Sequence, residues 1–292
     1  MSQYYISVLD AVCEKGNGRD NEDAVGWLPN AVWVLDGVSG LETSIVGGGT
    51  AARWYAQTFS AHFSRHMLMQ PDASTLSLIN LAIDDCRSLW ADLGQPDMAE
   101  PAATFAMLRL VDGQIELTSI GDSAIRFKDM EGRVTVFGDR SVEPFEQKTL
   151  DRLIALQKEQ PDAPHSELSK ALKSSQRNNR QYVNREDGYN VLTLSPMVPR
   201  NIVSSTLPNN AETDFLLTSD GFSRYTEVLE ISDERAFFAR AQEQSLGTIL
   251  DEIRTTEQSD PDCRIHPRMK QFDDATALKV RVRNLTRHKS DA

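Results

Sequence analysis

The sequence predicts a mixed α+β protein in which sheets lie inside and helices outside. Of the 292 residues, 40% are hydrophobic and 25% are charged, which is typical of a folded globular chain rather than a disordered one. Short β-rich runs occur in clusters, and the stretches between the clusters have the apolar spacing of helices. Strand clusters interrupted by helix pairs are expected to pack as separate layers.

The first half of the chain predicts strands, a helix pair and then a second group of strands. Residues 4–12 and 31–35 are β-rich runs. Residues 50–63 and 74–93 carry apolar side chains at helical spacing, and Ser74 is placed to cap the second helix. Four further short runs predict an antiparallel meander at 104–111, 114–120, 124–128 and 133–137.

The second half predicts an exposed excursion and then a return to strands. Residues 146–185 are expected to form a helix followed by a polar loop. Within them the basic, Asn-rich stretch 176–180 predicts a mobile, flap-like excursion at about 165–190. One domain is expected over 1–285, followed by a polar tail at 286–292. The remaining expected elements are helices within 223–257 and strands at 191–194, 202–206, 214–218 and 275–282.

The charge and the cysteines exclude several classes of protein. With 31 basic and 43 acidic residues the formal net charge is −12, which opposes nonspecific binding to nucleic acid or to an anionic membrane. The N-terminus lacks the pattern of a signal peptide, and no apolar run approaches the length of a membrane span. Three scattered cysteines suit neither a disulfide framework nor a zinc site. We therefore expect a cytoplasmic protein that binds neither nucleic acid nor membrane.

Acidic residues recur where apolar runs end. Asp36 and Asp220 each end such a run and precede a glycine, and Asp122 follows a glycine at a strand end. The other acids beside predicted strands are Glu22, Asp23, Asp273 and Asp274. Taken singly, each is best interpreted as a solvated turn residue, since Asp-Gly is a common turn.

Their joint occurrence indicates a cation site. A buried strand that ends at Asp-Gly can hold the Asp carboxylate rigidly in a cleft. The glycine lets a backbone carbonyl approach a ligand closely. Several converging carboxylates repel one another unless cations neutralise them. Oxygen ligands without His or Cys select magnesium, manganese or calcium rather than zinc.

A series of short motifs then carries a resemblance to a known family. The motifs are Arg19-Asp20-Asn21-Glu22-Asp23, Asp36-Gly37-Val38-Ser39-Gly40, Ala103-Thr104, Gly121-Asp122-Ser123, Ser219-Asp220-Gly221-Phe222 and Asp273-Asp274-Ala275-Thr276. The set resembles the protein phosphatase 2C family, the metal-dependent PPM phosphatases of phosphoserine and phosphothreonine, in its bacterial type. The motifs follow the family's order from about residue 8 to residue 282.

The resemblance implies a four-layer α-β-β-α sandwich, in which two central antiparallel sheets are flanked by helix pairs. It implies a cleft at one end of the sheets with two divalent cations, manganese or magnesium, and a weaker third one. Asp36 would bridge the first two cations, the Gly37 carbonyl would touch one of them, and Arg19 would grip the substrate phosphate. The other implied ligands are Asp220 and Asp273 at the second cation, Asp23 with Glu22 directly or through water, and Asp122 with Asp220 at the third.

The implied reaction is hydrolysis of phosphoserine or phosphothreonine by a metal-bridging hydroxide, with Asp36 and Asp220 as the catalytic carboxylates. The implied partners are a phosphorylated protein and a cognate Ser/Thr kinase. Two alternatives stay open. One is a catalytically weak regulatory module that binds a phosphoprotein, and the other is a phosphatase of the same fold that acts on a small metabolite.

The chain departs from the family pattern at several positions. Arg19 lies four residues before Asp23, one closer than in many bacterial members. The register to Thr276 makes Asp273 the metal ligand and leaves Asp274 as a secondary candidate. The other departures are Val38 where animal members have His, Ser39 for Gly, Ala124 for Arg, and Asp274 for Asn.

Three further patterns are expected to be structural. His62 and His66 lie one helical turn apart, a spacing that can bind metal, but no third ligand is suggested nearby. The glycines at 47–49 precede a helix and are expected to form a sharp turn. Cys263 and Arg268 match the formal Cys-x5-Arg spacing but lack the glycines of a phosphate-binding loop.

Overall fold

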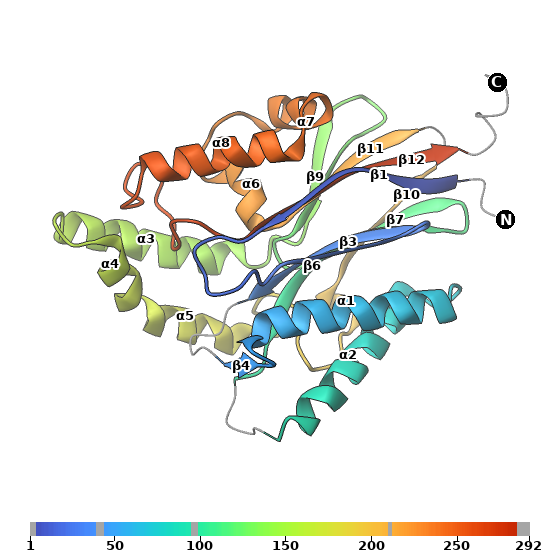
Figure 1. The fold of residues 1–292 in the computed structure, drawn as a ribbon, viewed down its shortest axis with the longest axis horizontal. Helices are drawn as coiled ribbons and strands as arrows, with labels where there is room; N and C mark the ends of the chain where they lie inside the picture. The colour runs from blue at the N-terminus through green and yellow to red at the C-terminus, as the bar shows by residue number, and fades with distance from the viewer. Residues whose placement is uncertain (1–3, 39–43, 95–98, 210–211, 285–292) are drawn as a thin grey trace.

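Two antiparallel sheets of five strands each lie face to face at the centre of the protein (Figure 1). The computed structural model describes residues 4–38, 44–94, 99–209 and 212–284. The first sheet contains, in order, β1 (Tyr4–Glu14), β12 (Ala275–Asn284), β11 (Thr213–Thr218), β8 (Ala124–Lys128) and β9 (Val134–Gly138). The second contains β10 (Val203–Pro208), β7 (Gln114–Ile120), β6 (Ala102–Val111), β3 (Ala31–Val38) and β2 (Ala24–Leu28). The predicted α+β class is confirmed.

Helices cover the outer face of each sheet, so the layer order is α-β-β-α (Figure 1). The second sheet is covered by α1 (Ala51–Met69) and α2 (Thr75–Asp92). The first is covered by α6 (Asp220–Glu227), α7 (Glu234–Glu243) and α8 (Leu246–Ser259). Beyond one end of the sheets lie α3 (Glu143–Glu159), α4 (His165–Ala171), α5 (Lys173–Asn179) and the 3-10 turn η1 (Arg180–Tyr182).

Strand β3 shows how the side chains divide between the layers. Trp33 and Leu35 pack against the α1–α2 layer, whereas Val32 and Val34 pack between the two sheets. Because successive side chains of a strand point to opposite faces, Asp36 belongs on the inter-sheet side with the two valines. The strand runs past the predicted end at residue 35, and it therefore holds Asp36 rigidly at the end of the sandwich.

The predicted meander is wrong in one respect, because its four strands belong to two sheets. Strands β6 and β7 pair in the second sheet, whereas β8 and β9 pair in the first. The chain crosses between the sheets at Gly121, whose φ of 77° is a conformation that residues with a Cβ rarely adopt. The crossing leaves Asp122 between the two sheets, where a simple hairpin turn would have exposed it.

Three local predictions also need correction. Strand β2 was not predicted, because Gly26 interrupts its β pattern; a Cβ at Gly26 would overlap the ring of Trp33, so packing requires the glycine. Residues 191–194 form no strand and make only an isolated bridge to β6. Residues 176–180 are helical, within α5 and η1, and are not a loop.

Other predictions are confirmed or fall outside the described part of the chain. Ser74 caps α2 by accepting a hydrogen bond from the amide of Ser77. The glycines at 47–49 form the turn between the short strands β4 (Ile45–Val46) and β5 (Gly49–Thr50). Ser39-Gly40 of the second motif and the polar tail at 286–292 lie outside the described residues. Among the helices that are described, none is long and apolar enough to cross a membrane.

Candidate active site

The structure brings five of the predicted acids together at one end of the sandwich. Asp36 lies on β3, and Asp220 is the first residue of α6. Each of these two carboxyl groups affects the pKa of the other, so the two lie near each other. The group, here called the acidic cluster, consists of Asp23, Asp36, Asp122, Asp220 and Asp273. Asp36 is its centre, because the charges of all four others act on it.

Burial and mutual repulsion dominate the electrostatics of the acidic cluster. Burial raises the pKa of Asp36 well above its ordinary value, and the carboxylates of Asp23 and Asp220 raise it further. Burial likewise raises the pKa of Asp122 and of Asp220. Carboxylates that have lost water and face like charges need either protons or cations. The cluster is therefore a site for positive charge.

Asp23 gives the clearest sign that a cation belongs in the cluster. Both of its carboxylate oxygens are buried and have no hydrogen-bond partner of good geometry among the described residues, although the Thr276 hydroxyl is near enough to lower the pKa of Asp23. Oδ1 of Asp122 likewise has no such partner. A buried polar atom without a partner is costly, so each such atom implies a missing partner. Carboxylate oxygens are the ligands that magnesium and manganese prefer. The residues present thus fit the divalent cations that the resemblance implies.

The pKa of Asp23 leads to a pH prediction for the metal-free protein. Burial raises this pKa to about 8 in the folded state, whereas an unfolded Asp titrates near about 3.9. The folded state therefore keeps a proton that the unfolded state loses, so the stability is complete below about pH 4 and falls as the pH rises towards 8. We expect the melting temperature, measured with chelator, to fall from about pH 6 to about pH 8.

Two controls accompany this measurement. Asp23→Asn should make the slope shallower, because one of the titrating groups is removed. Saturating manganese should remove or reverse the fall of melting temperature with pH, because metal binding requires ionised carboxylates. Asp273, whose pKa is lowered, acts with the opposite sign but only at more acidic pH. A metal-free melting temperature that rises over this range would contradict the electrostatic account.

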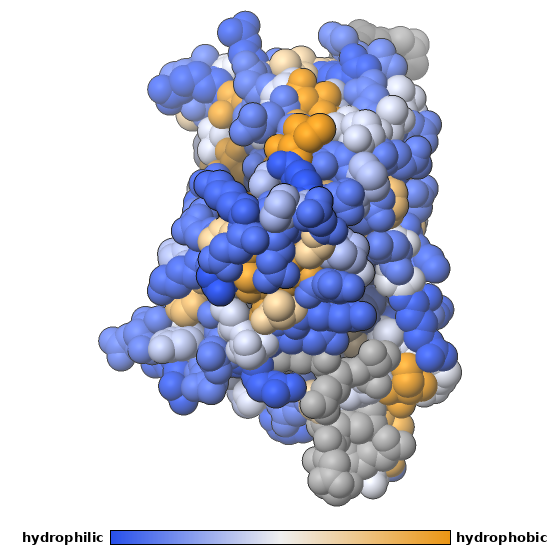
Figure 2. Space-filling model, turned by 90° about the vertical axis from the view of Figure 1, so that its left-hand side faces the viewer, coloured by the Kyte–Doolittle hydropathy of each residue, from blue (hydrophilic) through white to orange (hydrophobic). Residues whose placement is uncertain are grey.

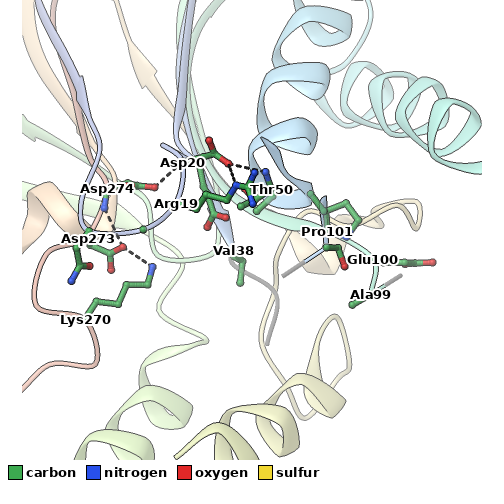
Figure 3. A pocket seen from close by; sticks show the side chains of 16 residues that line it. Arg19, Asp20, Val38, Thr50, Ala99, Glu100, Pro101, Lys270, Asp273 and Asp274 are labelled. Atoms are coloured by element: carbon green, nitrogen blue, oxygen red, sulfur yellow. Dashed lines mark hydrogen bonds and ion pairs between the residues drawn. The ribbon is translucent and has the colours of Figure 1, made fainter. Parts of the chain in front are cut away.

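Asp273 differs from the other members because the protein itself supplies its counter-charges. Nη2 of Arg224 lies 2.7 Å from Oδ2 of Asp273. Nζ of Lys270 lies 2.6 Å from Oδ1 of Asp273 (Figure 3). Although burial alone would raise it, Lys270 and Arg224 hold the pKa of Asp273 below its ordinary value. A metal ion at Asp273 would therefore compete with two protein cations.

A buried network fixes these cations in place. Glu257 on α8 is fully buried and accepts hydrogen bonds from Arg224 at 2.8 Å and from Arg254 at 2.8 Å. Arg254 also donates to the backbone carbonyl of Asp273 at 2.8 Å. The position of Asp273 is thus determined from the helix layer as well as from the strand that follows it.

Asp274 holds in place the loop that carries Asp23. Its two carboxylate oxygens accept hydrogen bonds from the amides of Gly16 and Glu22, each at 2.7 Å. These oxygens are therefore engaged by backbone, which favours a positioning role for Asp274 over ligation. Glu22 itself is buried beside the same cleft.

We expect Asp273→Asn and Asp274→Ala to fail in different ways. Asp274→Ala leaves two buried amides unpaired, so it should lower the free energy of unfolding by about 3 kcal/mol and displace the Asp23 loop. Asp273→Asn keeps the shape of the side chain and should mainly lower the catalytic rate. Urea unfolding in metal-free buffer, together with initial rates, separates the two effects. Wild-type stability of Asp274→Ala would show that the loop is held by other contacts.

The glycines that follow Asp36 and Asp220 have a packing role. A Cβ at Gly37 would lie 2.5 Å from the carbonyl oxygen of Glu22, and a Cβ at Gly221 would overlap the carbonyl of Asp274. The amide of Gly37 also donates to Glu22 O at 3.1 Å. Glycine is therefore needed for the loop and the strand ends to meet. Contact of the Gly37 carbonyl with a cation stays a prediction.

A cleft of about 270 Å³ opens beside Asp273 (Figure 3). Its lining includes Arg19, Val38 and Lys270, so it combines two cationic side chains with an apolar one. The Arg19 side chain is more than half exposed, and its guanidinium makes a 3.4 Å contact to the carbonyl of Gly48. The surface at this end of the molecule is mainly hydrophilic (Figure 2).

Sequence reasoning missed one acid of the site and both cations around Asp273. Glu146 lies in the first turn of α3, where its side chain is still exposed to solvent. Partial desolvation by the surrounding protein raises its pKa to about 7, with the charge of Asp220 adding to the rise. Glu146 is also the strongest charged influence on Asp122. An acid in the first turn of a helix is common, since it complements the helix dipole, so no motif marks Glu146.

The formal Cys-x5-Arg match is structural, as predicted. Cys263 is fully buried, and Arg268 donates to the side chain of Asp260 at 2.8 Å and to its carbonyl at 2.9 Å. Its guanidinium therefore holds a loop together and faces no phosphate-binding cavity among those described.

A family model described as protein phosphatase 2C matches residues 15–256. The chain belongs to the protein phosphatase 2C family. The catalytic domain of the serine/threonine phosphatase PstP, solved in complex with two manganese ions, is 13% identical, with a TM-score of 0.57 over 96% of this chain and 99% of that one. No curated protein sequence matches the chain.

Two further solved structures share this phosphatase 2C fold. PstP/Ppp of Mycobacterium tuberculosis is 14% identical, with a TM-score of 0.56 over 94% of this chain and 98% of that one. MsPP of Mycobacterium smegmatis, a PPM Ser-Thr phosphatase solved with cacodylate, is 15% identical, with a TM-score of 0.53 over the same shares of the two chains. At these identities the similarity shows the fold, and it confirms the sandwich predicted from the motifs. The match to the family model confirms the predicted family.

Proposed function

We propose that this protein phosphatase 2C homologue is a metal-dependent phosphatase of phosphoserine and phosphothreonine in proteins. The observation that supports this most is the unpaired state of the Asp23 carboxylate inside the acidic cluster. Two divalent cations held there, manganese or magnesium, would lower the pKa of water and offset the charge of a phosphoryl group. A third, weaker cation is proposed at Asp122 and Asp220.

We assign each member of the acidic cluster a role from its position. The charges of all the other members act on Asp36, so we assign it the bridge between two cations. Asp220 lies near Asp36 and would hold one of them, with Asp273 beside it. Asp23 and the Gly37 carbonyl would complete the site. Because these groups come from strand ends and the start of a helix, the scaffold fixes them before any substrate binds.

The cleft supplies the positive charge that a phosphate needs. Arg19 and Lys270 line it, and both carry donors suited to phosphoryl oxygens. Lys270 is held beside Asp273, so its ammonium group is already oriented. We propose that Arg19 and Lys270 orient the phosphate, and that the segment 176–187, which begins in α5 and η1, influences which phosphoprotein is accepted.

Lys270→Met is expected to change substrate and metal binding in opposite directions. The loss of a charge-assisted hydrogen bond should raise KM for a phosphopeptide by roughly tenfold or more. The freed Asp273 should lower the manganese concentration needed for half-maximal activity. Lys158→Met, an exposed lysine on α3, is the matched control. An unchanged KM with unchanged manganese dependence would remove Lys270 from the site.

One observation favours a second candidate function. Both oxygens of Asp273 are paired with protein cations, which would weaken metal binding and suit a catalytically weak module that binds a phosphoprotein. In either case we propose a cytoplasmic protein whose partner is phosphorylated by a cognate Ser/Thr kinase.

A comparison of substrates distinguishes the candidates. Initial rates with manganese are measured on phosphoserine and phosphothreonine peptides, on p-nitrophenyl phosphate and on sugar phosphates. A preference for the peptides supports the proposed function. A preference for sugar phosphates would indicate a metabolite phosphatase, and tight binding of the peptides without turnover would indicate the regulatory module.

A further inference from the structure

Three potential metal ligands meet between α1 and α2, away from the acidic cluster. His62 and His66 lie one turn apart on α1, and Asp85 faces them from α2. Nδ1 of His62 lies 2.8 Å, and Nε2 of His66 2.6 Å, from the same oxygen, Oδ2 of Asp85. The sequence showed the two histidines but no third ligand. The packing of α2 on α1 supplies it.

We propose that His62, His66 and Asp85 form a binding site for zinc or a similar transition-metal ion. Their ligand atoms all lie within 4.8 Å of one another. Tetrahedral zinc with bonds of about 2.0–2.1 Å places its ligand atoms roughly 3.4 Å apart, so a small opening of the trio admits the ion. Imidazole nitrogens suit zinc, copper and nickel, whereas the all-oxygen acidic cluster suits magnesium and manganese.

The hydrogen bonds at the trio are more numerous than one oxygen can accept. Besides the two histidines, Nη2 of Arg65 lies 3.1 Å from Oδ2 of Asp85. A carboxylate oxygen offers about two lone-pair directions, so three donors compete for it. A metal ion in the middle of the trio relieves this competition, because each side chain then contributes one lone pair to the ion.

The surroundings of the trio also suit an ion. The His66 side chain is nearly buried, whereas those of His62 and Asp85 are 24% and 30% exposed. An ion can thus enter from solvent and keep a water as its fourth ligand. The Arg65 side chain is 55% exposed, so it can turn away from Asp85 into solvent.

The ion would fasten the helix pair that supports the catalytic strand. The first turn of α1 packs on β3, since a Cβ at Gly37 would come within 3.2 Å of the backbone of Ala52. His62 lies ten residues further along the helix, or roughly 15 Å at a rise of about 1.5 Å per residue. The two metal sites are therefore separate, and they can be tested separately.

The test is a zinc titration of the full chain by calorimetry, with excess magnesium present to occupy the acidic cluster. We expect wild type to bind one zinc ion per chain, and zinc to raise the melting temperature. His62→Gln and Asp85→Asn should weaken this binding by roughly 100-fold or more, because even groups outside the ligand shell cost about 10–100-fold when removed. Cobalt in place of zinc should show the intense visible bands of a tetrahedral site.

Two variants serve as controls. His266→Gln changes a histidine whose ring lies 3.1 Å from the carbonyl oxygen of Val228, and the variant should bind zinc like wild type. Arg65→Gln removes the competing cation and should tighten binding. The proposal is overturned if wild type binds no zinc at micromolar concentration. It is equally overturned if zinc binding and the cobalt bands survive in His62→Gln, a partly exposed position at which the fold should tolerate the change.

Discussion

Asp36→Asn is expected to lower turnover of a phosphopeptide by at least about 10³-fold, or roughly 4 kcal/mol in the activation barrier, and to leave the fold intact. The charges of the four other members of the acidic cluster act on Asp36, so losing its charge disturbs every cation position at once. Asparagine has the same shape, so the packing of β3 should persist. Initial rates at saturating manganese give the size of the effect.

Stability provides the control for Asp36→Asn. Because Asp36 is buried among like charges, removing its charge should not lower, and is expected to raise, the melting temperature of the metal-free protein. Asp251→Asn, at an exposed position on α8, is the matched variant for both measurements. Turnover within about tenfold of wild type, roughly 1.4 kcal/mol in the barrier, would show that Asp36 does not bridge the catalytic cations.

The rate of phosphate release is expected to depend steeply on the leaving group. Val38 lines the cleft where a histidine would donate a proton, and none of the described histidines lines this cleft. General acid catalysis typically contributes 10²–10⁴-fold, so its absence should appear when aryl phosphates of rising leaving-group pKa are compared. Lys270 is a poor substitute, because Asp273 raises its pKa even though burial opposes the rise.

Val38→His provides the second half of this test. If the imidazole fits, it should speed the hydrolysis of poor leaving groups more than that of good ones. A nearly flat dependence in wild type would mean that another group donates the proton. Glu146, whose pKa of about 7 suits an acid, would then be the first residue to replace, before Asp122 and Glu22.

The members of the acidic cluster were predictable as a group because the local sequence marks several of them. An apolar run that ends at Asp-Gly is visible in the chain at Asp36 and Asp220, and the alternation along β3 places Asp36 on the inter-sheet face. The order of the motifs then indicated the family, and with it the sandwich. Such sequence patterns predict the structure well because they mark where a strand ends and where two backbone segments pack closely.

The other charged residues around the acidic cluster were not predictable, because their positions depend on which segments pack against one another. Glu146, Arg224 and Lys270 carry no motif, and they enter the site only through the packing of α3, α6 and the loop before β12. The same holds for Asp274, which was interpreted as a secondary ligand before its contacts with two backbone amides were known. Asp85 likewise joins His62 and His66 only through the packing of two helices.

The most direct test of the central claim is the manganese dependence of phosphate release from a phosphoserine peptide. The acidic cluster predicts turnover with manganese, loss of turnover with excess chelator, and recovery when manganese is restored. Turnover that persists in chelator would show that the reaction does not depend on cations at the cluster. No turnover by the folded protein at any manganese concentration would contradict the assignment of a phosphatase.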